Sequence, residues 1–177
     1  MASIVTKMGD KGNTSLLLGG KVAKDSPRIE LAGALDELCS FLGVSRSLLK
    51  HPKTKTNLKK IQKDLFVIGA EVSTKPHFLK RLKHRMDQDH VDWIEKWIQQ
   101  LENKNCFKRS SFCLPGENFI ASTLDVSRTI ARRAERQAVY LSKRKQLRNR
   151  FILIYLNRLS DLLYLLARYC ERGARGK

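Results

Sequence analysis

Apolar residues recur three or four positions apart along most of the chain, which is the spacing of one face of a helix. A capping residue followed by proline, at Asp25-Ser26-Pro27, begins the first of these runs. Asp87 and Asn118 stand where two later runs begin, and the second run stops before Pro76. The pattern predicts five helices that include residues 31–42, 58–72, 91–101, 118–144 and 151–172.

The other segments carry little periodicity. The first 24 residues are rich in Gly, Thr, Ser and Lys, which predicts a loop or short hairpin, and the basic stretch 76–86 predicts a mobile loop. The fifth helix is apolar nearly all round, so we expect it at the centre of the fold. The sequence therefore predicts one all-α domain over residues 1–177, in which segment 1–24 precedes a five-helix bundle over 25–177.

Charge and composition narrow the function classes. The chain has 35 Lys+Arg against 17 Asp+Glu, a formal net charge of +18, which favours anionic partners such as nucleic acid, polyphosphate or nucleotide. No apolar run reaches the roughly 18 residues of a membrane span, and the start has no signal-peptide pattern. The four cysteines are scattered, which predicts buried free thiols and no metal site. We expect a cytoplasmic protein without a membrane partner.

The N-terminal segment has the composition of a phosphate cradle. Its glycines let the backbone approach an anion, its hydroxyls donate hydrogen bonds, and nearby lysines add charge. It is not a Walker A loop, because no Gly-x-x-x-x-Gly-Lys-Ser/Thr occurs. The composition by itself also fits an ordinary surface turn. The candidate residues are Thr6, Lys7, Gly9, Asp10, Gly12, Asn13, Thr14, Ser15 and Lys24.

The fourth predicted helix carries a row of arginines. Arg128, Arg132 and Arg136 are four positions apart and so share a face, with Glu135 beside Arg132. Three planar guanidinium groups suit a polyphosphate, although a solvated basic stripe explains them equally well. Alanines on the same helix allow neighbouring helices to approach, so we expect the arginines to be half-buried.

Polar residues also interrupt the other helices. Asn157, Asp161, Tyr164 and Arg168 form a seam on the fifth helix, which indicates either a structural network or a ligand site. On the first helix, Asp36 lies among small residues, which predicts close packing against another helix and an arginine partner. The loop that contains Phe112 reads by itself as a core plug.

Six ordered segments together resemble the PduO-type ATP:corrinoid adenosyltransferases and cover most of the chain outside 50–110. They are TKMGDKGNTS at 6–15, VAKDSPR at 22–28, GALDELCS at 33–40, FCLPG at 112–116, RTIARRAER at 128–136 and LNRLSD at 156–161. The resemblance implies a homotrimeric helical bundle with active sites between subunits. Its implied reaction transfers the 5′-deoxyadenosyl group of ATP to cob(I)alamin, giving adenosylcobalamin and triphosphate, with Mg²⁺ held through the ATP phosphates.

The resemblance also implies residue roles. In the catalytic set, Asp36 pairs with Arg128 across the subunit boundary, Phe112 lies under the corrin ring and excludes the lower axial ligand, and Arg132 closes the ATP site. The implied ATP site contains the N-terminal candidates and Lys24. It also contains Arg28, Arg132, Glu135, Arg136 and Asn157. The cobalt of the corrinoid is the nucleophile, so the protein needs to position two ligands and neutralise a leaving polyphosphate.

Two departures from the family pattern concern the corrinoid side: Cys39 replaces the usual Asn, and Glu117 replaces a common second Gly. The basic excess of 51–111 is not explained by this chemistry. An alternative is therefore a nucleic-acid or polyanion-binding helical protein on the same scaffold, and a third hypothesis is a sensor that binds adenosylcobalamin without turnover. A corrinoid reductase and an adenosylcobalamin-dependent enzyme are expected partners of the enzyme.

Overall fold

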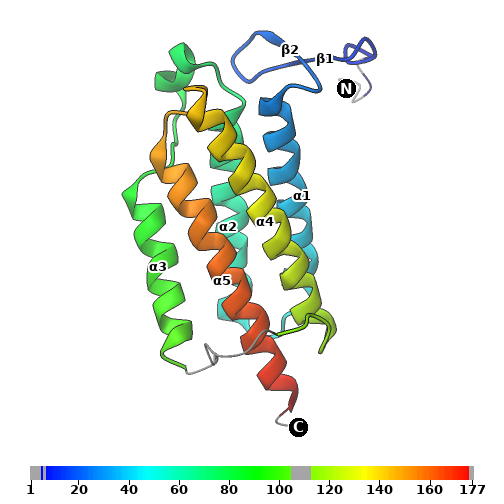
Figure 1. Cartoon of the computed structure of the whole chain (residues 1–177), viewed down its shortest axis with the longest axis vertical. Coiled ribbons are helices and arrows are strands. Elements are labelled where there is room, and N and C mark those ends of the chain that lie inside the picture. Colours follow the sequence, from blue (N-terminus) through cyan, green and yellow to red (C-terminus); the bar gives the residue numbers. More distant parts are fainter. Residues whose placement is uncertain (1–4, 6, 105–112, 176–177) are drawn as a thin grey trace.

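Helices dominate the structure, as the apolar spacing predicts. The computed structural model describes residue 5 and residues 7–104 and 113–175, with side chains to residue 172. Long helices in this part of the chain lie side by side in a bundle (Figure 1). They are α1 (Pro27–Leu48), α2 (Pro52–Val72), α3 (Gln88–Glu102), α4 (Phe119–Lys143) and α5 (Arg150–Arg175).

The predicted helix starts are confirmed at atomic detail. The Asn118 side chain accepts a hydrogen bond from the Ala121 amide at 2.9 Å, and Asp87 accepts one from the His90 amide at 3.3 Å. Pro27 occupies the first position of α1, although the Ser26 side chain makes no capping hydrogen bond. Each cap satisfies an amide that the helix itself leaves free.

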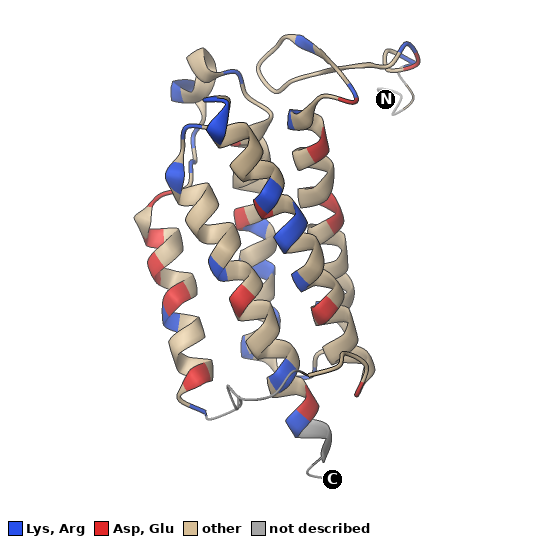
Figure 2. Ribbon diagram, in the orientation of Figure 1, with Lys and Arg blue, Asp and Glu red and all other residues tan. Residues whose placement is uncertain are grey.

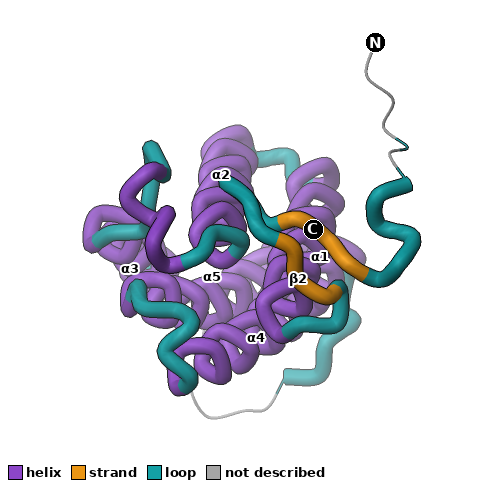
Figure 3. The backbone as a smooth tube through the Cα atoms, turned by 90° about the horizontal axis from the view of Figure 1, so that it is seen from above, coloured by secondary structure: helices purple, strands orange, loops and turns teal. Residues whose placement is uncertain are grey.

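Helix α5 lies at the centre, as its all-round apolar surface predicts. It packs against both α3 and α4, and α4 in turn packs on α1 (Figure 3). Tyr155, Leu156 and Leu159 of α5 are fully buried. Ala131, Ala134 and Ala138 of α4 are also fully buried, so this helix approaches its neighbours closely. None of the described helices is long and apolar enough to cross a membrane.

The stretch 76–86 is more ordered than the sequence predicts. A 3₁₀ helix, η1, occupies Pro76–Arg81, and buried Glu71 fixes the end of the segment. Its carboxylate accepts hydrogen bonds from the Met86 amide at 2.6 Å and from Arg85 at 3.2 Å, and Asn149 donates to both carboxylate oxygens. The prediction of a loop is wrong for 76–81, which forms a 3₁₀ helix, and the end of the segment is anchored because the buried carboxylate requires hydrogen-bond donors.

The N-terminal segment forms the predicted short hairpin. Strand β1 (Asn13–Ser15) pairs antiparallel with β2 (Lys21–Ala23), and the Leu17 amide joins the hairpin to the end of α2 by donating to the Ser73 carbonyl at 2.8 Å. Arg28 provides a second attachment. Its guanidinium donates to the carbonyls of Val72, Thr74 and Gln146, so it joins the start of α1 to α2 and to the α4–α5 turn.

Candidate functional site

Lys24 lies directly over the glycine-containing loop. A Cβ added to Gly9 would come within 2.9 Å of Lys24 Nζ, so the absence of a side chain at Gly9 makes room for the ammonium group. The Lys24 amide donates to the Gly12 carbonyl at 2.9 Å, which fixes the lysine backbone against the same loop. Gly12 has φ +76°, a conformation that favours glycine.

The rest of the loop is open to solvent. The Gly12 amide donates to the Gly9 carbonyl at 3.2 Å, which closes a turn, and the flanking candidate side chains are exposed except for half-buried Thr14. The exposed candidates are Lys7, Asp10, Asn13, Ser15 and Lys24. Thr6 lies outside the described residues. The structure therefore brings the loop and Lys24 together, with the exposed lysines Lys7, Lys11 and Lys24 able to reach an anion.

The arginine row winds around α4 instead of lining one cavity. Arg128 and Arg132 border a cavity of about 460 Å³ between α3, α4 and α5, together with Asp161 and Tyr164 of the polar seam. Arg136 borders a second cavity, of about 380 Å³, against the start of α1. Successive i+4 steps advance 40° around a helix, which accounts for the separation.

The prediction that the three arginines are half-buried is correct only for Arg128. Its side chain is 24% exposed, whereas Arg132 and Arg136 are exposed. The buried alanines of α4 turn toward the helix contacts, and the two later arginines project away from them. Both guanidinium groups are consequently available to a ligand.

A buried chain of alternating charges fixes Arg128, and the sequence did not point to it. Asp125 accepts from Arg128 Nε at 2.9 Å and also pairs with Arg168, whose guanidinium lies 2.8 Å from Glu171. Arg168 and Asp125 are each 4% exposed. Such burial is tolerated because each charge has a partner of opposite sign. The seam residue Arg168 is thus part of a structural network behind the cavity.

The remaining seam residues join α5 to its neighbours. Asn157 Nδ2 donates to Glu135 at 2.9 Å, which brings two of the predicted ATP-site residues together. Arg158 donates to the Asn157 side-chain oxygen and to Glu95, each at 2.8 Å. Asp161 faces the cavity, where burial raises its pKa while Arg158 and Arg132 act in the opposite direction. The network reading of the seam is confirmed for Asn157 and Arg168, whereas Asp161 and Tyr164 line the cavity.

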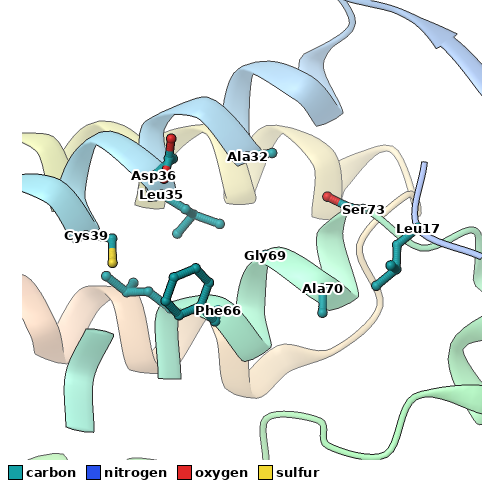
Figure 4. Close-up of a pocket in the computed structure, with 10 residues that line it drawn as sticks. Leu17, Ala32, Leu35, Asp36, Cys39, Phe66, Gly69, Ala70 and Ser73 are labelled. Carbon is teal, nitrogen blue, oxygen red and sulfur yellow. The ribbon is translucent and has the colours of Figure 1, made fainter. Parts of the chain in front are cut away.

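Asp36 lies on another face of the bundle. It is exposed at the rim of an apolar groove of about 300 Å³ between α1 and α2. Figure 4 shows Ala32, Leu35 and Asp36 along α1 opposite Phe66 and Gly69 of α2, with Leu17 of the hairpin at one end. Phe66 is 69% exposed, which is unusual for a large apolar side chain. The face on which close helix packing was expected is open within this chain.

A family model described as cobalamin adenosyltransferase matches residues 4–170. The chain belongs to the cobalamin adenosyltransferase family. It is 36% identical to a corrinoid adenosyltransferase of Citrobacter freundii, over 97% of this chain and 96% of that protein. A corrinoid adenosyltransferase of Bacillus subtilis (strain 168) is also 36% identical, over 93% of this chain and 84% of that protein.

Solved structures of the family share the fold. An F112A variant PduO-type ATP:corrinoid adenosyltransferase from Lactobacillus reuteri, complexed with cobalamin and ATP, superposes with a TM-score of 0.86 at 36% identity and covers 98% of this chain and 96% of its own. An R132K variant from the same organism, complexed with ATP, gives a TM-score of 0.85 at 36% identity and covers 97% and 96%. These matches extend over almost the whole chain.

Phe112, which the resemblance places under the corrin ring, lies outside the described residues. The described part of the chain contains no group of three or more His, Cys, Asp or Glu side chains placed to hold a metal ion. Cys39, Cys113 and Cys170 are half-buried and form no disulfide within the described residues, and burial raises the pKa of Cys170 to about 11.

Proposed function

We propose that the chain transfers the 5′-deoxyadenosyl group of ATP to cob(I)alamin, with adenosylcobalamin and triphosphate as products. The observation that supports this proposal is the position of the Lys24 ammonium over the Gly9 backbone in a member of this family, a position from which it could bind a phosphate. The F112A variant from Lactobacillus reuteri has cobalamin and ATP bound and the R132K variant has ATP bound, in agreement with the proposed substrates.

In this proposal the loop and the bundle hold different parts of ATP. Thr6, the loop residues and Lys24 receive the phosphates, while Arg132 and Arg136 approach from α4 with free guanidinium groups. Glu135 and Asn157, already hydrogen-bonded to each other, form a preset polar edge. Arg28 changes role: its donors go to three backbone carbonyls, so we assign it to positioning the loop and not to direct phosphate contact.

The chemistry requires positioning more than proton transfer. The Co–C bond forms as the C5′–O bond breaks, and the electron pair of that bond leaves with triphosphate. The chain therefore has to align two substrates and stabilise the leaving anion, for which Lys24 and the arginines are suited. We assign Phe112 to the lower face of the corrin, where its ring would exclude an axial ligand.

The described residues do not supply a protein-held magnesium site, because no cluster of three candidate ligands exists among them. We propose that Mg²⁺ enters as the counterion of ATP, bound by phosphate oxygens, a common arrangement for this ion. No step assigned to the protein depends on a metal ligand.

We further propose a single-domain chain that assembles as a homotrimer with sites between subunits. Asp36 is exposed beside the α1–α2 groove, whereas Arg128 borders the cavity of α3, α4 and α5. Two side chains on separate faces of one rigid bundle can pair only between chains. The exposed Phe66 and the open small-residue face of α1 supply the apolar surface that such an interface needs.

One anaerobic experiment tests the activity. Protein is mixed with chemically reduced cobalamin and Mg·ATP, the corrin spectrum is recorded, and the phosphate products are separated by ion-exchange chromatography. We expect the adenosylcobalamin spectrum to appear with one triphosphate per corrinoid. ATP turnover without corrinoid, or release of ADP and phosphate, would refute the proposed reaction. Sedimentation of the same sample tests the trimer independently.

A further inference from the structure

Two basic segments meet at one end of the bundle. Segment 73–86 follows α2 and contains η1, and segment 142–150 contains the turn from α4 to α5 (Figure 1). Asn149 Nδ2 donates to the Met86 carbonyl at 2.8 Å, which joins the two segments directly. Arg28 joins them a second time, through the carbonyls of Thr74 and Gln146. They form one continuous surface, which we name the basic cap.

The basic cap has one sign of charge. Its two segments contain ten Lys and Arg residues and no Asp or Glu. These are Lys75, Lys80, Arg81, Lys83, Arg85, Lys143, Arg144, Lys145, Arg148 and Arg150. All except half-buried Lys75 are exposed, and Figure 2 shows Lys and Arg gathered at this end. The buried carboxylate of Glu71 forms a salt bridge with Arg85. Asp87, the first carboxylate after segment 73–86, pairs with His90.

Several arginines of the cap are held by stacking on aromatic rings. Arg144 lies 3.5 Å from the centroid of the Tyr140 ring, and Arg150 lies 5.2 Å from that of Phe151. Arg81 stacks in the same way on Phe78 of η1, at 5.4 Å. A cation held over a ring face loses part of its freedom before a ligand binds, which lowers the entropy cost of binding phosphate oxygens.

We propose that the basic cap binds the phosphodiester backbone of a nucleic acid, independently of sequence. None of the ten cations belongs to the candidate ATP site, so the property is additional to the proposed function. Within segments 73–86 and 142–150, which are described in full, no large hydrophobic side chain is exposed.

This composition distinguishes the partner classes. Protein interfaces depend on apolar and aromatic anchors, and peripheral membrane binding depends on apolar insertion. A nucleic-acid backbone needs closely spaced cations and bidentate arginines, which the cap provides. A polyanionic strand is therefore the partner that this surface fits.

The test is fluorescence anisotropy of a labelled single strand of about 20 nucleotides, RNA or DNA, titrated with the full chain between about 50 and about 200 mM KCl. We expect micromolar binding that weakens steeply with salt. Replacement of Lys83, Arg144 and Arg148 together by Gln should weaken binding by about tenfold or more and reduce the slope of log K against log salt by about 2. The transferase reaction should be retained.

A matched control removes the same charge elsewhere. Lys53, Lys59 and Lys63 are exposed on α2, and their replacement by Gln should change the affinity less than about twofold. The single substitution Arg148→Glu checks the same loss of binding, and a thermal melt of this variant checks that it folds. Equal weakening in both triple variants would show diffuse charge and overturn the proposal. Competition by polyglutamate as strong as by RNA, or binding to anionic vesicles alone, would also overturn it.

Discussion

Two regions of the proposed active site are built in opposite ways. On the bundle side, Arg128, the proposed partner of Asp36 from another subunit, is fixed by Asp125, and Asp125 is fixed by Arg168, with both of these partners nearly inaccessible to solvent. On the loop side, Lys7 and Lys24 are exposed and held by backbone hydrogen bonds of one short hairpin. One side has its geometry before a ligand binds, and the other acquires much of it from the ligand.

The difference separates stability from binding. Buried ion pairs affect the whole bundle, because loss of one partner leaves a charge without compensation. Exposed cations near a glycine turn contribute little to the folded state, and their interaction with an anion appears mainly as affinity. Substitutions on the two sides should therefore move different measurements.

The largest expected effect is on the bundle side. Asp125→Ala leaves Arg168 buried with Glu171 as its remaining carboxylate and frees Arg128 from its anchor, so we expect the free energy of unfolding to fall by about 3–5 kcal/mol. Urea unfolding followed by circular dichroism measures this loss. The double variant with Arg168→Met should recover part of the stability. A loss below about 1 kcal/mol would contradict the structural role of the network.

On the loop side we expect a substitution to change the apparent ATP requirement and to leave the free energy of unfolding nearly unchanged. Lys24→Ala removes one charge-assisted contact, so the apparent ATP requirement should rise by about 10- to 100-fold. The unfolding free energy should remain within about 0.5 kcal/mol of the wild type. Lys21→Ala, in the same hairpin and equally exposed, is the matched control and should leave the ATP requirement nearly unchanged. Parallel weakening by both substitutions would mean that general charge, and not the position over Gly9, attracts ATP.

The smallest expected effect concerns Asp161 at the cavity. Burial raises the pKa of Asp161 in the folded state. Above this raised pKa the ionised carboxylate lowers the free energy of unfolding. The destabilisation disappears as the pH falls through the raised pKa to the ordinary value of 3.8. Asp161→Asn should therefore raise the melting temperature by about 1–2 °C at neutral pH, with a difference that vanishes in acid. Scanning calorimetry across pH measures both. A lower melting temperature at neutral pH would show that the attraction of Arg158 and Arg132 outweighs the burial.

Local signals predicted the helices well. Asn118 and Asp87 cap α4 and α3 as expected because each side chain acts within three residues of its own helix. The 3₁₀ helix η1 was missed, since six residues give no measurable apolar period and its neighbourhood is organised by Glu71 from a distance. The nearly all-round apolar surface of α5 correctly predicted its central position.

The site was predictable where residues of one function lie close in sequence. The glycines and lysines at the N-terminus predicted a loop with nearby cations, and the seam on α5 predicted that its polar side chains have partners, as Asn157 has in Glu135. Asp125 was missed because a carboxylate inside a polar-looking helix resembles a surface residue. Asp125 lies three residues before Arg128, with Ala121 and Leu124 before it and Ser127 after it. These neighbours are buried, and they are the signal that could have marked Asp125 as buried.

The attachment by Arg28 has a consequence for the order in which the molecule folds. Its guanidinium reaches carbonyls 44 and 118 positions along the chain, so these contacts close the longest loops near the site. Loop closure of that length is slow compared with helix formation, because chain entropy must be lost before the contact is gained. The helices can form and dock first, and the hairpin is seated only when both the end of α2 and the α4–α5 turn are in place. We therefore expect a newly made chain to seat its N-terminal hairpin last, after the bundle that supports it.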